Sequence, residues 1–137
     1  MATYNPNELV LLSKTDEVTL DVDADIRGRK VVSSAGDELG TVHDLLIDQT
    51  TNRVRALVVN HGHLFSKTTS AIPVEAVTKI TADEVVIDQN KDKVGDGPAY
   101  DPTLVYEEDY YVDVYDYYGY TPFWYDEYVY PAYPYYV

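Results

Sequence analysis

The residues of this chain that could carry out chemistry are histidines and carboxylates, because the sequence contains no cysteine and so neither a thiolate ligand nor a disulfide. His61 and His63 flank a single glycine, and His43 lies upstream of them. Imidazole groups at such spacings could bind a transition metal. The intervening glycine favours a turn, and a histidine at the tip of a turn is usually solvated. We interpret His61 and His63 as turn residues, place His43 on the preceding strand, and expect no metal.

Three aspartates, Asp21, Asp23 and Asp25, stand at alternate positions and raise the question of calcium. A calcium loop of the EF-hand type also needs glycine at its sixth position and glutamate at its twelfth. Those positions hold Ile26 and Val32. Apolar and polar residues alternate strictly from Val18 to Arg27, which is typical of a half-buried strand or an extended arm with one solvated face.

Catalytic groups do not stand in a recognisable arrangement. No serine, histidine and aspartate have the local context of a hydrolase, and no glycine-rich loop could cradle a phosphate. Glu38, Asp44 and Asp48 surround a turn and a strand, so a carboxylate pair for acid–base chemistry is the alternative that stays open. We expect a protein that is not an enzyme and that uses no cofactor.

The charge of the chain restricts its partners, because the formal net charge is −14. Nucleic-acid binding needs lysine and arginine to neutralise phosphates, and an anionic membrane surface also attracts basic segments rather than acidic ones. No apolar run has the length of a membrane span. The N-terminus lacks the basic and apolar regions of a secretory signal. We therefore expect a cytoplasmic protein with no nucleic-acid partner and no membrane span.

The elements that would position a site begin with the stretch from Asp25 to Asn60. It contains a short β-branched segment at 30–32 and two apolar runs at 40–48 and 54–60, separated by the polar turn 49–52. Such runs are typical of strands, and a polar turn between two strands predicts an antiparallel hairpin. Apolar residues are consecutive in both runs, so we expect a closed barrel or a strand covered by another element. The predicted core residues are Leu46, Ile47, Val58 and Val59.

The remaining segments complete a small β-rich domain. Residues 70–72, 79–80 and 85–87 read as strands, and Pro73 starts a short turn or helix at 74–77. Residues 9–12 fit either a helix that starts near Asn5 or a strand. Gly95 to Pro98 are turn-forming residues that mark the end of the domain. We divide the chain into an N-terminal arm or short helix at 1–17, a β domain at 18–94 and an acidic, tyrosine-rich tail at 95–137.

The same stretch resembles the PRC-barrel family. The resemblance rests on five segments whose order and spacing match, namely Asp25-Ile26-Arg27-Gly28, Gly36 with Leu39-Gly40-Thr41-Val42, Asp44-Leu45-Leu46-Ile47-Asp48, Val54-Arg55-Ala56-Leu57-Val58-Val59 and Ile72-Pro73-Val74-Glu75-Ala76-Val77. It implies a small, mostly antiparallel β-barrel, and thus an all-β fold with short helical turns and an extended C-terminal arm. The likeness is greatest to soluble, single-domain bacterial members linked to stress. It implies an attachment module and supplies no catalytic residue.

The tail differs in composition from everything before it. All but one of the 15 tyrosines follow Pro98, and no lysine or arginine follows Lys93. One interpretation is a disordered acidic tail, although disordered segments are usually poor in aromatic residues. The other is a recognition arm, because tyrosine and tryptophan bury a large area at a low entropy cost. Residues 111–117 have the composition of a strand, which could add to a sheet edge or dock on a basic surface. The cations available for stacking on tyrosine are Arg27, Arg29, Lys30, Arg53 and Arg55.

These observations support two hypotheses about function. The first is a non-catalytic protein-interaction module that self-assembles, as an oligomer or filament, by docking its aromatic arm on neighbouring barrels. The second is a monomeric stress-response adapter whose tail binds another protein or a carbohydrate. The predicted interaction residues are Tyr111, Tyr115, Tyr117, Tyr120, Phe123, Trp124, Tyr125, Tyr128 and Tyr130.

Overall fold

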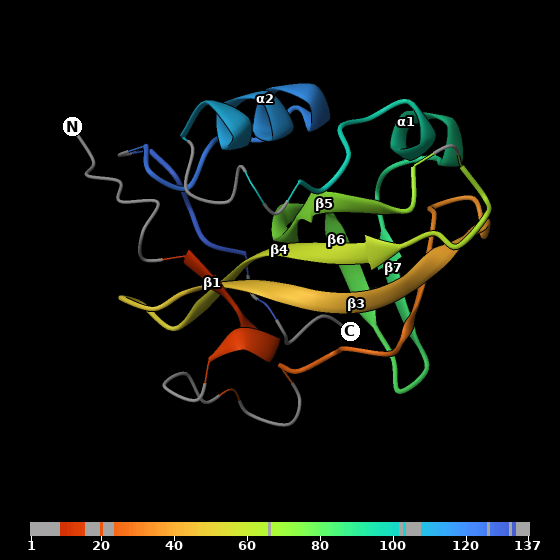
Figure 1. The fold of residues 1–137 in the computed structure, drawn as a ribbon, viewed down its shortest axis with the longest axis horizontal. Helices are drawn as coiled ribbons and strands as arrows, with labels where there is room; N and C mark the ends of the chain where they lie inside the picture. The colour runs from red at the N-terminus through yellow and green to blue at the C-terminus, as the bar shows by residue number, and fades with distance from the viewer. Residues whose placement is uncertain are drawn as a thin grey trace.

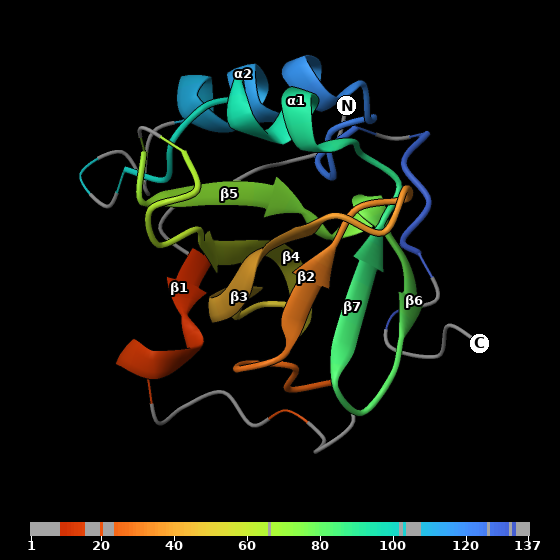
Figure 2. The same cartoon turned by 90° about the vertical axis from the view of Figure 1, so that its right-hand side faces the viewer.

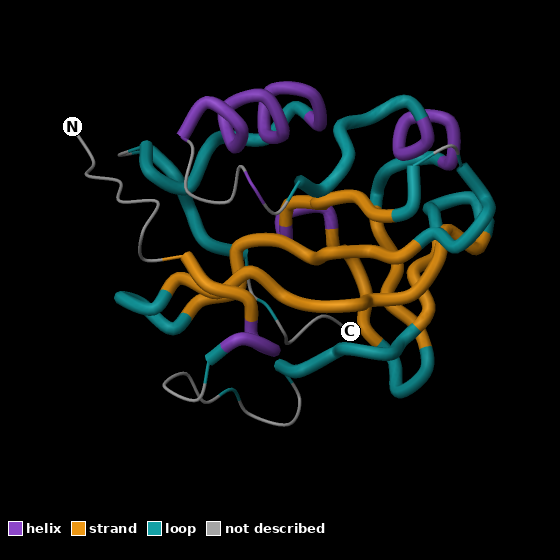
Figure 3. Tube along the Cα trace, viewed as in Figure 1, coloured by secondary structure: helices purple, strands orange, loops and turns teal. Residues whose placement is uncertain are grey.

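A single sheet organises the protein. The structure is a computed structural model, and it describes residues 9–15, 20, 24–65, 67–101, 103, 108–125, 127–131 and 133. The strands are β1 (Leu9–Leu11), β2 (Lys30–Val32), β3 (Glu38–Asp48), β4 (Arg53–Asn60), β5 (Thr69–Pro73), β6 (Val77–Ile80) and β7 (Glu84–Ile87). Two 3₁₀ turns, η2 (Leu12–Lys14) and η3 (Val74–Ala76), and two α-helices, α1 (Lys91–Gly95) and α2 (Glu108–Tyr118), complete the described elements. Both α-helices lie on one side of the strands (Figures 1, 2 and 3).

The strand order is β5-β4-β3-β2-β7-β6, and β1 pairs with β3. Most neighbours are antiparallel, but β2 and β7 run parallel, so the sheet is mixed. Among the described strands no pairing joins β5 to β6. The expected barrel closure is therefore not seen, and two α-helices make the fold mostly β rather than all-β.

The β3–β4 hairpin is the predicted centre of the fold, and its antiparallel pairing is confirmed. Asn52 closes the turn in the left-handed region at φ 58°, a conformation that asparagine tolerates better than most residues. Gly40 is required where β3 passes β4, because a Cβ atom there would lie 2.1 Å from the Asn60 carbonyl oxygen. Register shifts between Val42 and Asp44 and between Leu46 and Ile47 interrupt the ladder.

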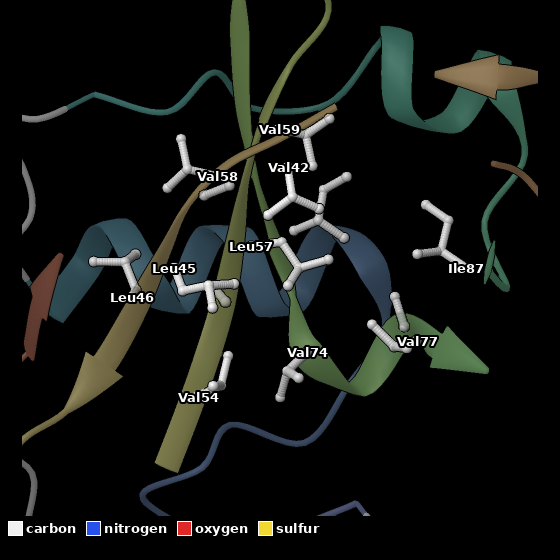
Figure 4. Packing of buried hydrophobic residues seen from close by; sticks show 14 of the residues in the cluster. Val42, Leu45, Leu46, Val54, Leu57, Val58, Val59, Val74, Val77 and Ile87 are labelled. Carbon is white, nitrogen blue, oxygen red and sulfur yellow. The ribbon is translucent and has the colours of Figure 1, made fainter. Parts of the chain in front are cut away.

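The core lies around this hairpin, and all four predicted core residues are buried. Figure 4 labels three of them, Leu46, Val58 and Val59. Neighbouring residues in a strand point to opposite faces, so burial of both Leu46 and Ile47, and of both Val58 and Val59, means that both faces of the hairpin are covered. Figure 4 shows α2 crossing behind the hairpin, and α2 packs against β5. The consecutive apolar runs are thus explained by a covering helix.

The alternation from Val18 to Arg27 predicted a strand or an extended arm. Residues 24–27 form no strand; residues 18–19 and 21–23, including Asp21 and Asp23, lie outside the described part. The expectation of a strand at residues 111–117 is wrong, because these residues belong to a helix and are not extended. Residues 9–11 form a strand, which resolves the alternative left open there. The helix start near Asn5 also lies outside the described residues.

Candidate functional site

The candidate site is the seam where the aromatic tail lies against the sheet. We call the described residues 108–125, 127–131 and 133 the docked tail. Helix α2 forms the first part of the docked tail. The buried residues of the helix recur with helical spacing on one face, whereas Asp109, Asp113 and Asp116 are exposed on the other. The buried residues of the helix are Tyr110, Tyr111, Val114, Tyr115 and Tyr118.

A glycine cap turns the tail back toward the sheet. Gly119 has φ 83°, its N–H donates to Asp116 O, and the N–H of Tyr120 donates to Tyr115 O over 3.1 Å. This pair of bonds is a Schellman motif, which satisfies carbonyl groups that a helix end leaves free. The cap lets the chain reverse, so that the described residues 120–125, 127–131 and 133 return across the strands.

Tyr115 is the largest fully buried side chain of the docked tail, with 1% of its surface exposed. Its hydroxyl donates to the Arg55 carbonyl oxygen on β4 over 3.2 Å. Its ring makes edge contacts with Phe123 and Trp124, at centroid distances of 5.8 and 6.0 Å. Edge-to-face pairs of this kind add to the stabilisation from buried area. Tyr115 therefore joins the helix, the returning segment and the sheet.

Arg55 is the residue of the sheet that makes the main contacts with the docked tail. Its side chain is buried and pairs with Asp48 through an Nη2–Oδ2 distance of 3.1 Å. The carbon at the centre of its guanidinium lies 4.5 Å from the Phe123 ring centre and 5.7 Å from that of Tyr130. Arg53 lies 4.6 Å over the same Tyr130 ring. A desolvated guanidinium over aromatic rings contributes up to about 2 kcal/mol, so the stacking helps to offset the burial of the charge.

Glu75, on η3, is a half-buried residue whose carboxyl group lies mostly covered under the same segment. The Tyr128 hydroxyl donates to its Oε2, while its Oε1 has no hydrogen-bond partner among the described residues. Burial raises the pKa of Glu75 above its ordinary value, and the hydrogen bond from Tyr128 opposes this only in part. Burial also raises the pKa of the Tyr115 and Tyr128 hydroxyl groups, with the Glu75 charge as a further cause. The seam thus favours neutral, protonated groups around Arg55.

Further hydrogen bonds attach both ends of the docked tail to the domain. Tyr110 donates to Ala99 O over 2.8 Å, and Tyr117 donates to Lys93 O over 2.5 Å. Tyr130 donates to Val54 O over 3.2 Å, and the Tyr133 hydroxyl donates to Ala24 O. The tail contacts therefore extend from α1 across β4 to the segment before β2.

The family comparison bears on the sheet that carries these contacts. The family model described as the PRC-barrel domain matches residues 21–94, which is more than half of the chain. The chain belongs to the PRC-barrel family. Comparison with curated proteins gives no match. PRC-barrel domains are generally non-catalytic and mediate protein interactions. The docked tail lies outside the matched residues, so it is an addition to the PRC-barrel domain.

The predicted interaction residues divide into two groups on this PRC-barrel domain. Most lie against it, including Trp124, which is 8% exposed. Tyr125 is the exception, with 48% of its surface exposed. Of the predicted cations, Arg53 and Arg55 stack on tail rings, while Arg27 pairs with Asp25. Sequence reasoning missed Glu75 as a partner of the tail and Asp48 as the ion-pair partner of Arg55, because neither stands in a pattern that separates it from other carboxylates.

The histidines have a structural place in the PRC-barrel domain. His61 is buried, with Nδ1 2.6 Å from Leu39 O and Nε2 2.8 Å from Ser70 Oγ. The expectation that it is a solvated turn residue is therefore wrong, because the turn folds its ring back between β3 and β5. His43 and His63 are exposed. Within the described residues no group of three histidine, aspartate or glutamate side chains is placed to hold a metal, and no helix is long and apolar enough to cross a membrane.

Proposed function

We propose that this protein is a non-catalytic interaction module that self-assembles by exchanging its aromatic tail between PRC-barrel domains. The observation that carries the proposal is the Arg55 site, where rings of Phe123, Tyr128 and Tyr130 surround a buried guanidinium. The same surface accepts the same rings whether the tail comes from its own chain or from a second copy. Exchange of identical elements between protomers is a low-cost route to oligomers.

The connection before the tail supports exchange. Ala99 bridges to Ser70 and the Tyr100 N–H donates to Thr69 O, so the chain stays on the edge of β5 as far as Tyr100. Helix α2 begins at Glu108. Seven residues separate these two points in the sequence, and a fully extended segment of that length spans at most about 24 Å, which sets the distance over which exchange can occur. The outward acidic face of α2 disfavours stacking of tails on each other and leaves the arginine site as the partner surface.

Chemical cross-linking between single-cysteine variants tests exchange directly, because the chain has no cysteine of its own. Gln89 contacts Tyr120, so Gln89→Cys and Thr121→Cys place thiols on the two sides of the seam without changing charge. We mix the two single variants and add a short, flexible bis-maleimide. Exchange predicts covalent dimers whose yield rises with protein concentration, and light scattering should show oligomers of the unmodified chain.

Two controls make this experiment decisive. The double variant, with both cysteines in one chain, should cross-link within the monomer and so reports docking on the chain's own domain. Asp37→Cys, in the exposed turn between β2 and β3, replaces Gln89→Cys as a thiol away from the seam. Cross-linking of the double variant alone, with none between mixed single variants at any concentration, would contradict self-assembly by exchange.

A second candidate function is binding of a different protein while the tail stays on its own domain, as in a stress-response adapter. It is favoured by the outer surface of the docked tail, where Tyr125 and Val129 are 48% and 83% exposed. Both residues belong to the same short stretch of the docked tail, and exposed apolar surface of this kind can mark an interaction site. Tyr125→Ser with Val129→Ser would abolish this binding and leave exchange unchanged.

A further inference from the structure

The place of Glu75 beneath the docked tail points to a control device. It belongs to η3, directly before edge strand β6, and it is covered by residues that approach from three other elements. Arg55 comes from β4, Tyr115 from α2, and Tyr128 from the returning tail segment. The negative charge of Glu75 also contributes to raising the pKa of Tyr120 and Tyr130, which belong to the same segment. Most of the groups that bury this carboxyl therefore belong to the tail.

The hydrogen bonds at Glu75 do not suit a charged carboxylate. The Tyr128 hydroxyl donates to Oε2, and the Tyr115 hydroxyl also interacts with the carboxyl group, but Oε1 is shielded from water and has no hydrogen bond of ordinary geometry among the described residues. Arg55 does not neutralise it by direct contact, since the ion pair of Arg55 is with Asp48. A buried carboxylate with unmet acceptor capacity costs free energy that a protonated carboxyl avoids. The docked tail thus favours a proton on Glu75.

A route for that proton is present. A cavity of about 330 Å³ lies beside Glu75, lined also by Tyr120, Thr121, Glu127, Tyr128 and Val129. Thr121, Glu127 and Val129 are exposed, so the cavity opens to solvent. Glu127 is a second acidic residue that lines the same cavity.

We propose that Glu75 is a proton-controlled latch for the tail, which is held firmly when the carboxyl is protonated and is loosened for exchange when the proton leaves. The latch rests on the proposed function only where it controls assembly. Release of the tail from its own domain can be measured separately. Undocking exposes the carboxyl to water and returns its pKa toward the ordinary value. Because the docked state binds the proton more tightly, docking is favoured at low pH and weakens as the pH rises from the ordinary glutamate range through the raised pKa.

Acrylamide quenching of Trp124, the single tryptophan, tests the latch on the full chain. Trp124 is buried when the tail is docked, so the quenching constant reports release. We expect the quenching constant to rise at least about two-fold from pH 5 to pH 8 in the wild type. Converted to free energy, a two-fold change is about 0.4 kcal/mol. Glu75→Gln, which stays neutral and still accepts from Tyr128, should hold the constant at its low value throughout.

The controls separate the latch from general charge effects. Glu84→Gln removes one exposed glutamate from the neighbouring strand β7 and should keep the wild-type pH dependence. Glu75→Leu is a second neutral variant in case Glu75→Gln does not fold, and circular dichroism checks both. A wild-type quenching constant that does not change with pH, or neutral variants that change as the wild type does, would overturn the latch.

The latch and the exchange proposal can fail separately. If mixed single-cysteine variants form dimers but the quenching constant does not change with pH, exchange is supported and the latch is wrong. Quenching that follows pH and Glu75, with no dimers at any pH, would leave the latch standing and remove self-assembly.

Discussion

The guanidinium carbon of Arg55 lies 4.5 Å from the centre of the Phe123 ring, although the two residues are 68 positions apart in the chain. Asp48 fixes one edge of the same guanidinium. The planar group therefore presents its face to the tail while its charge stays paired on the sheet. Arginine is suited to this double contact, because it stacks on rings and forms directional ion pairs at once.

Arg55→Lys should loosen the tail without removing the charge. Lysine keeps the positive charge near Asp48, but it loses the planar face that stacks on Phe123 and Tyr130. We expect docking to weaken by about 1–2 kcal/mol, seen as a red shift of Trp124 emission at lower urea than in the wild type. Arg27→Lys is the matched control, since Arg27 lies at the surface and pairs only with Asp25 among the described residues. Equal effects of the two substitutions would contradict a special role for Arg55.

Sequence reasoning located the sheet well because its signals are local. The turn between β3 and β4 is polar, and the runs around it are β-branched and apolar, so the hairpin and its core were predictable. The helical form of residues 108–118 was missed because tyrosine and valine favour strands, while the buried positions from Tyr110 to Tyr118 recur with the period of a helix. Glu75 could not be found, since its role depends on burial by residues about 40–50 positions away in the chain.

Gly40→Ala should destabilise the fold more than Gly36→Ala. Both glycines have positive φ angles, 140° and 92°, so each alanine incurs backbone strain of about 1 kcal/mol. Only at Gly40 would the new Cβ meet another atom, the Asn60 carbonyl oxygen at 2.1 Å, whereas at Gly36 nothing lies within 4 Å. We expect an additional loss of about 2 kcal/mol or more at Gly40, measured by urea unfolding. Equal losses would show that β3 and β4 can separate there without cost.

His61 should contribute to stability in a pH-dependent way. Burial lowers the pKa of the His61 imidazole, so the folded protein holds it neutral between Leu39 O and Ser70 Oγ. The unfolded chain takes up a proton near pH 6.5, so this contribution is present above that value and is lost as the pH falls toward the lowered pKa. His61→Ala should cost about 1–3 kcal/mol at pH 8 by leaving buried polar groups unpaired.

His63→Ala is the control for this prediction, because His63 lies exposed two residues away. A surface substitution of this kind usually changes stability by less than about 0.5 kcal/mol. If both alanine variants matched the wild type, His61 would be the solvated turn residue that the sequence alone indicated.

A truncated chain that ends at Gly97 should bind its own tail, added as a separate peptide, and should be stabilised by it. Truncation exposes Arg55, Glu75 and the face of the hairpin that α2 covers, so we expect a folded but less stable domain with a lower melting temperature. A peptide of residues 98–137 restores the rings of Phe123 and Tyr130 at Arg55, and ligands that bind only the folded state raise its stability by mass action.

The expected result is a rise in melting temperature that saturates with peptide concentration, with a blue shift of Trp124 emission as the peptide binds. Because the contacts combine buried rings with a paired charge, raising salt should weaken binding only modestly. The matched control is a peptide with Phe123→Ser and Tyr130→Ser, which keeps the acidic charge and removes the rings that face Arg55. If the two peptides bound equally, net charge rather than aromatic burial would hold the tail, and a truncated domain that bound neither would lack a surface for a second copy's tail.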